Sequence, residues 1–173
     1  MNDYNIIFGG HGSTVTSDDS SIIAGGNYST VTGGDCSIIM GGHESTITGE
    51  DDSLITGGYG STITGGDNSI IIGGDKSTVT GGHESVVIGG DKSIVTGGHD
   101  SKVIGQHHST LTGKDNSTVM GGIESTVIGG EESTLIVEYW DGKYIRVAIG
   151  YVGEDGIEPN VPYHVIDGKL VKV

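Results

Sequence analysis

The sequence predicts an all-β fold, a two-sheet parallel β-solenoid with two octads (sixteen residues) per coil and a C-terminal β cap. Residues 1–136 divide into 17 octads without an insertion or a deletion. Every octad carries Ile, Val or Leu at its seventh position, and successive octads alternate between two outer patterns. The period ends at Ile136, and residues 137–173 read as β-rich runs separated by turns. A strict short period is typical of stacked repeat architectures, so we predict a solenoid over 1–136 and a cap over 137–173.

Each octad is expected to form one corner and one short strand. Positions one and two are mostly Gly-Gly, which suits a corner because glycine accepts positive φ. Positions five to eight are rich in β-branched residues and predict a strand. Alternation along the strand places positions five and seven inside and positions six and eight outside. Position five is serine from Ser13 to Ser133. Its buried hydroxyl therefore needs a partner, most simply the next serine of the stack or a corner amide.

One kind of octad presents threonine at both outward positions. The predicted ice-binding or water-binding residues are Thr14, Thr16, Thr30, Thr32, Thr46, Thr48, Thr62, Thr64, Thr78, Thr80, Thr96, Thr110, Thr112 and Thr126. Stacking would arrange them about 7 Å apart along a strand and about 4.8 Å apart between coils, a grid near the oxygen spacings of ice. The alternative is that threonine is simply a good exposed strand residue. The absence of any charge at these outward positions favours water ordering.

The other kind of octad is apolar at positions six, seven and eight alike, which is typical of a strand buried on both sides. We therefore predict a homodimer or a higher homo-oligomer. The residues predicted to form its interface are Ile22, Ile38, Met40, Leu54, Ile70, Ile72, Val86, Ile88 and Ile104. The alternative is that this face is a second, more hydrophobic ice or water surface.

The segment after the repeats contains two hairpin-turn signals, Asp141-Gly142 and Asp167-Gly168. They lie between β-rich runs, so a compact β cap is expected. Such a cap would cover the backbone and core that the last coil of a solenoid otherwise exposes.

The repeat resembles that of the bacterial ice nucleation proteins, whose central domain has the form AGYGSTxTAGxxSxLT. GGYGSTIT at residues 57–64 is the most similar octad. WDGK at 140–143, GIE at 156–158 and VPY at 161–163 are similar to the segment that follows the repeats in that family. The resemblance implies a β-solenoid whose Thr-x-Thr rows order water into an ice-like layer. It also implies assembly into larger bodies, and a cell-surface or extracellular location.

Composition argues against several other classes of function. The formal net charge of −15 disfavours nucleic acid and anionic membrane surfaces as partners. No apolar run is long enough to span a membrane. The one cysteine, Cys36, cannot form an internal disulfide. No Ser/His/Asp set stands out from the repeat and no glycine pattern leads into a helix, so the sequence predicts neither an enzyme nor a cofactor.

Two metal sites are alternatives to a metal-free surface. Asp3, Asp19, Asp35, Asp51 and Asp67 would stack on one edge, where calcium could relieve their repulsion. Calcium-binding β-rolls, however, need nine residues per half-coil, so solvated acids are favoured. His107 and His108 could bind a metal, although surface histidines are favoured there too.

The sequence therefore predicts an ice-binding or ice-nucleating solenoid that self-associates through its apolar face. The alternative function is a structural or adhesive surface or fibre solenoid without ice activity.

Overall fold

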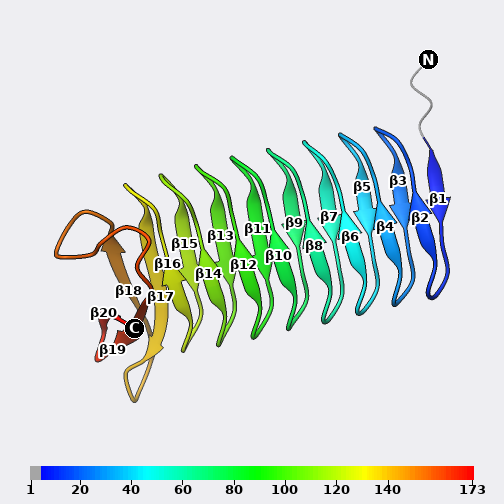
Figure 1. The fold of residues 1–173 in the computed structure, drawn as a ribbon. Helices are drawn as coiled ribbons and strands as arrows, with labels where there is room; N and C mark the ends of the chain where they lie inside the picture. The colour runs from blue at the N-terminus through cyan, green and yellow to red at the C-terminus, as the bar shows by residue number, and fades with distance from the viewer. Residues whose placement is uncertain (1–4) are drawn as a thin grey trace.

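A computed structural model describes residues 5–173; Asp3 of the predicted acid column lies outside this range. The chain forms a straight rod of stacked coils with a β cap at its C-terminal end (Figure 1). Two ten-stranded sheets run along the rod, and they are parallel until the cap is reached. The predicted all-β solenoid with two octads per coil is confirmed, since each solenoid strand pairs in register with the strand two octads later.

The odd-numbered solenoid strands form sheet A and the even-numbered ones form sheet B. Sheet A contains β1 (Ile6–Phe8), β3 (Ile22–Ala24), β5 (Ile38–Met40), β7 (Leu54–Thr56), β9 (Ile70–Ile72), β11 (Val86–Gly89), β13 (Lys102–Gly105), β15 (Thr118–Gly121), β17 (Thr134–Trp140) and β18 (Ile145–Tyr151). Sheet B contains β2 (Thr14–Thr16), β4 (Thr30–Thr32), β6 (Thr46–Thr48), β8 (Thr62–Thr64), β10 (Thr78–Thr80), β12 (Ile94–Thr96), β14 (Thr110–Thr112), β16 (Thr126–Ile128), β19 (Tyr163–Ile166) and β20 (Lys169–Lys172).

The position-seven side chains form the core, as predicted. From Ile23 to Leu135 they are almost completely buried, in one column from each sheet. The serines at position five are buried beside them. Because every coil contributes the same pair of aliphatic side chains, the core is continuous along the rod.

The buried serines form a ladder of hydrogen bonds between coils. The amide of Ser53 donates to Oγ of Ser69 at 3.1 Å, and that hydroxyl donates to the carbonyl oxygen of Glu50 at 3.2 Å. The same pair of bonds recurs at Ser109 and Ser117. The expectation of a serine or corner-amide partner was thus incomplete. The main acceptor is a corner carbonyl, and the amide comes from the serine one coil earlier.

The physical reason expected for the corner glycines is wrong. Positive φ falls at position four, where only Gly12 and Gly60 are glycines and residues such as Glu84 and Lys92 adopt φ of 53° and 57°. The glycine pairs at positions one and two instead allow close packing. A Cβ on Gly65 would lie 2.5 Å from Cδ1 of Ile71, and one on Gly26 would lie 2.8 Å from the backbone of Gly10.

The cap closes the last coil with two antiparallel hairpins. Strand β17 begins inside the repeats and continues to Trp140, and β18 returns along it. Strands β19 and β20 form the second hairpin, whose Asp167-Gly168 turn has two positive φ angles. The amide of Val152 donates to the carbonyl of Ser133, and Tyr163 is buried against the end of the core. Both hairpin signals in the sequence are therefore confirmed.

Candidate functional surfaces

Sheet B presents all fourteen predicted threonines on its outer surface. They form two straight columns, because Thr14 lies beside Thr30 and Thr16 beside Thr32, and this register continues along the sheet. Each threonine is exposed or half-buried, while the residue between each pair is buried in the core. The array is uninterrupted through five coils, from Thr14 to Thr80. Ile94, which is 55% exposed, then breaks one column, and Ile128 ends the other.

The threonine columns form a regular, uncharged grid on the outer surface of sheet B. Rows lie about 4.8 Å apart and the two columns about 7 Å apart. Each side chain offers a methyl group and a hydroxyl, and no outward position on the sheet B strands from β2 to β16 carries a charge. Charged groups would hold strongly oriented hydration water, so their absence suits a surface on which water follows the protein lattice.

Sheet A presents the predicted apolar residues on the opposite side of the rod. Ile22, Ile38, Met40, Leu54, Ile70 and Ile72 are between 37% and 47% exposed. Val86, Ile88 and Ile104 lie in the same columns and are half-buried. Lys102 is the one charged residue at the outward positions of the sheet A strands from β1 to β15.

Strand β18 extends the apolar face into the cap, which the sequence reasoning missed. Its outward residues Ile145, Val147, Ile149 and Tyr151 are 51–58% exposed. They lie beside the outward residues of β17, among which Glu138, the neighbour of Val147, is charged. Their alternation in IRVAIGY was the available signal. The turn motifs alone could not show which sheet the hairpin would join.

The two edges of the rod differ in charge because they are built from different corners. The corners that lead into sheet A form the acidic edge. Among the described corners, its charged residues are Asp18, Asp19, Asp35, Glu50, Asp51, Asp52, Asp67, Glu84, Asp100, Lys114, Asp115, Glu131 and Glu132, and its histidines are His83 and His99. The corners that lead into sheet B form the mixed edge. It carries Glu44, Asp75, Lys76, Asp91, Lys92 and Glu124 together with His11, His43, His107 and His108.

Many of the corner acids have a structural role instead of being simply solvated. Oδ1 of Asp51 accepts the amide of Asp67 at 2.8 Å, and Oδ1 of Asp67 accepts the amide of His83 at 2.7 Å. The same bond recurs on the mixed edge at Asp75 and Asp91. Through Oδ1, these side chains tie one corner to the next.

Most residues of the two alternative metal sites make hydrogen bonds or ion-pair contacts within the protein. Carboxylate oxygens of Asp19, Asp35 and Glu50 lie within 4.8 Å of one another on the acidic edge. Asp19 and Asp35, however, both accept backbone amides. Nδ1 of His107 accepts the amide of Ile123, whereas Nδ1 of His108 lies 3.1 Å from Glu124. The two adjacent histidines therefore make contacts with different partners.

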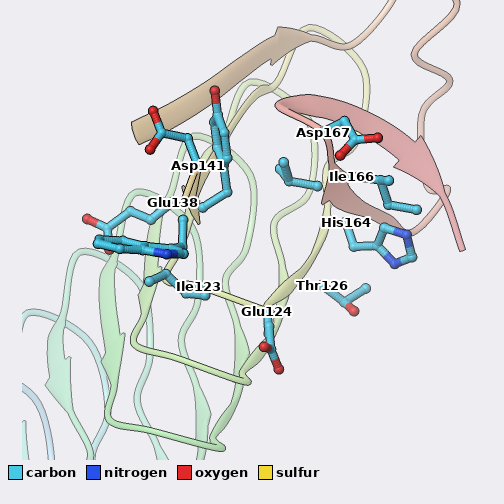
Figure 2. Close-up of a pocket in the computed structure, with 11 residues that line it drawn as sticks. Ile123, Glu124, Thr126, Glu138, Asp141, His164, Ile166 and Asp167 are labelled. Carbon is cyan, nitrogen blue, oxygen red and sulfur yellow. The ribbon is translucent and has the colours of Figure 1, made fainter. Parts of the chain in front are cut away.

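A cleft of about 880 Å³ opens between the two cap hairpins. Ile123, Glu138 and Asp141 lie on one side of it, and Thr126, His164, Ile166 and Asp167 lie on the other (Figure 2). Asp141 accepts the amides of Lys143 and Tyr144 and pairs with Arg146. The Tyr144 amide, followed by Arg146 and the Lys143 amide, lowers the pKa of Asp141 to about 2. The carboxylate of Asp141 therefore stabilises the turn between β17 and β18.

Residues 5–173 contain no helix that is long and apolar enough to cross a membrane. No protein-family model, no curated protein and no solved structure matches the chain. The function is therefore inferred from the fold and its surfaces.

Proposed function

We propose that the chain is an ice-binding solenoid that orders water on the threonine grid of sheet B, and that it self-associates through the apolar face of sheet A. One observation carries the proposal. Ten threonines, Thr14 to Thr80, stack in register over five coils with no charge among them. Hydroxyls held at lattice spacing anchor water, while the methyl groups prevent it from adopting a competing hydration shell.

Rigidity supports this role. Each coil is tied to the next by parallel backbone pairing, by the serine ladder inside and by the corner acceptors outside. A surface whose groups are already in place needs little further ordering when it binds, which raises affinity. The resemblance of the repeat and the cap segment to ice nucleation proteins points in the same direction.

The number of coils bears on the kind of ice activity. Nucleation depends on the area of ordered water, and a grid of eight coils is only about 35–40 Å long. We therefore expect a single chain to be a weak nucleator, or to restrain ice growth by adsorbing to crystals that already exist.

The experiment is ice shaping and droplet freezing with a surface-charged variant. Changing Thr46, Thr48, Thr62 and Thr64 to Lys places four cations at the centre of the grid and should abolish ice shaping. All four positions point outward, so the fold should persist, which circular dichroism would verify. Unchanged ice behaviour in the quadruple variant would show that the grid is not the ice surface.

A matched control separates the effect of position from the effect of charge. It places lysine at Asn68, Asp100 and Asn116, which are exposed corner residues of the acidic edge. Because one aspartate is replaced, the control adds the same positive charge as the quadruple variant. Ice shaping should persist in the control, and its loss would show that net charge rather than the threonine grid governs the activity.

The other candidate function is a structural or adhesive solenoid, and the same experiment decides between the two. A wild-type chain that neither shapes ice nor shifts droplet freezing would leave the fold as a spacer or fibre element.

A further inference from the structure

We propose that the apolar face packs against the same face of a second copy with the two rods parallel, related by a two-fold axis along the rod. This inference rests on the self-association part of the proposed function and adds the partner's orientation. It is carried by the shape of the apolar face and by the different charges of the two edges that flank it.

The apolar face is large enough for a stable contact. Ten strands spaced about 4.8 Å apart, each with an outward width of about 10–12 Å, give roughly 500 Å² of projected surface per chain. Two copies would then bury about 1,000 Å², near the lower limit for a specific interface. A largely apolar patch of about 500 Å² lies in the upper part of the range that monomers expose, and such patches are often functional.

A second copy is the occupant that fits the face. From β3 to β11 the two columns of the face are apolar at every outward position except Thr56, so an identical face offers matching ridges and grooves. Nearer to the cap, Lys102, Thr118 and Thr134 interrupt one of the two columns. Two-fold symmetry also closes the assembly, since each patch covers the other. An anionic membrane is a poor alternative because the acidic edge runs along the whole face.

The edge charges decide between the two orientations that face-to-face packing allows. A two-fold axis along the strands makes the rods antiparallel and keeps each edge beside its own equivalent. The acidic edge, with Lys114 as its one lysine and no arginine among the described corners, would then run beside a second acidic edge. Like charges that face each other repel, and wrong juxtapositions of this kind are a main source of specificity.

A two-fold axis along the rod instead places each acidic edge beside the partner's mixed edge. Lys76 and Lys92 then lie level with the acidic-edge coils that carry Asp67, Glu84 and Asp100. In this arrangement β18 packs on the β18 of the partner, and both caps lie at one end. The two threonine grids face outward in opposite directions, so each remains free to contact ice.

Energy transfer between labelled chains tests the orientation. Cys36 and Asn116 both lie at position four on the acidic edge, five coils apart, and both are exposed. The wild-type chain carries a dye on Cys36, and the Cys36→Ser/Asn116→Cys variant carries it at position 116. Donor and acceptor are paired as wild type with wild type, variant with variant, and wild type with variant. Parallel rods predict equal transfer for the two like pairs and the lowest transfer for the mixed pair, which is offset by about 24 Å along the rod.

Antiparallel rods would overturn this orientation, and they have a distinct signature. In antiparallel rods, the offset along the rod between the dyes of a mixed pair is the mean of the offsets in the two like pairs, each counted with its sign. The mixed pair therefore could not have the largest offset of the three. The assembly itself is tested by solution mass at physiological salt. A strict monomer at high concentration would overturn the contact, as would a dimer without transfer in any pair.

A fold-preserving variant separates this proposal from ice binding. Ile70→Thr/Ile72→Thr converts GGDNSIII into GGDNSTIT, the same pattern as the octad at 57–64. It should shift the mass to monomer while ice shaping per chain is retained. A variant that remains fully dimeric would contradict the proposed face. Loss of ice shaping with dimer mass unchanged would count against the face as well, and it would also show that sheet A contributes to ice contact.

Discussion

The small serine side chains inside the coils form hydrogen bonds that connect one coil to the next. Most of these hydroxyls accept an amide from the serine one coil earlier and donate to a corner carbonyl, as Ser69 does with Ser53 and Glu50. The repeat made the inward position of serine predictable. The carbonyl that each hydroxyl bonds was not predictable, because it belongs to the corner of the preceding coil and is brought close only by the stacking of coils.

Removal of one of these hydroxyls should destabilise the rod measurably. We expect Ser69→Ala to cost roughly 1–3 kcal/mol, because it leaves the buried amide of Ser53 without its acceptor and removes one of the hydrogen bonds to the carbonyl of Glu50. Thermal unfolding followed by circular dichroism would show a lower midpoint. Thr78→Ala, an outward change in the next octad, should change stability by less than about 0.5 kcal/mol. Equal effects from the two substitutions would argue against a structural role for the ladder.

Position four of the corner stores backbone strain that glycine would relieve. Glu84 adopts φ of 53°, a conformation that costs a side-chain-bearing residue about 1–2 kcal/mol. Glu84→Gly should therefore raise the stability, by a net of about 0.5–1 kcal/mol after the entropy gained by the unfolded chain. Gly60→Ala, at φ of 68°, should have the opposite effect. A thermal midpoint that falls in Glu84→Gly would show that the side chain stabilises the corner by contacts.

Strands of sheet B are the elements on which ice contact depends, and their pattern suggests a gain-of-function test. Ile94 in β12 interrupts a column that is otherwise threonine from Thr14 to Thr126. Ile94→Thr should join the two parts of the grid. It should therefore increase ice shaping and thermal hysteresis, the difference between the melting and freezing temperatures, at equal molar concentration. The matched control, Ile38→Thr on sheet A, adds the same hydroxyl on the opposite face and should give no gain. Equal behaviour of both variants would favour a general effect of hydrophilicity.

At the scale of strands, the sequence predicted the repeats better than the cap. Alternation along each strand and the two-octad period determine which side chains face inward, so sheets A and B followed directly. The cap strands lack a repeat to place them, and β18 could have joined either sheet. Its pairing with β17 depends on tertiary contacts, including the burial of Val137 and Val152 at the end of the core.

The whole molecule is a rod with two chemically different faces and two differently charged edges. One face is threonine, the other is aliphatic, and the cap closes one end of the core. The threonine and apolar faces were visible as alternating octads. The difference in charge between the edges is harder to predict, because acids occur in both kinds of corner and only the fold places the two kinds on opposite sides of the rod.

Adsorption to growing ice is the measurement that tests the central claim most directly. Cys36 is exposed on the acidic edge, away from both faces, so a dye there should leave the threonine grid untouched. The labelled wild-type chain should be incorporated into a single ice crystal grown slowly from its solution, whereas the variant with lysine in place of Thr46, Thr48, Thr62 and Thr64 should be excluded. Exclusion of the wild-type chain, or equal incorporation of both, would contradict the account.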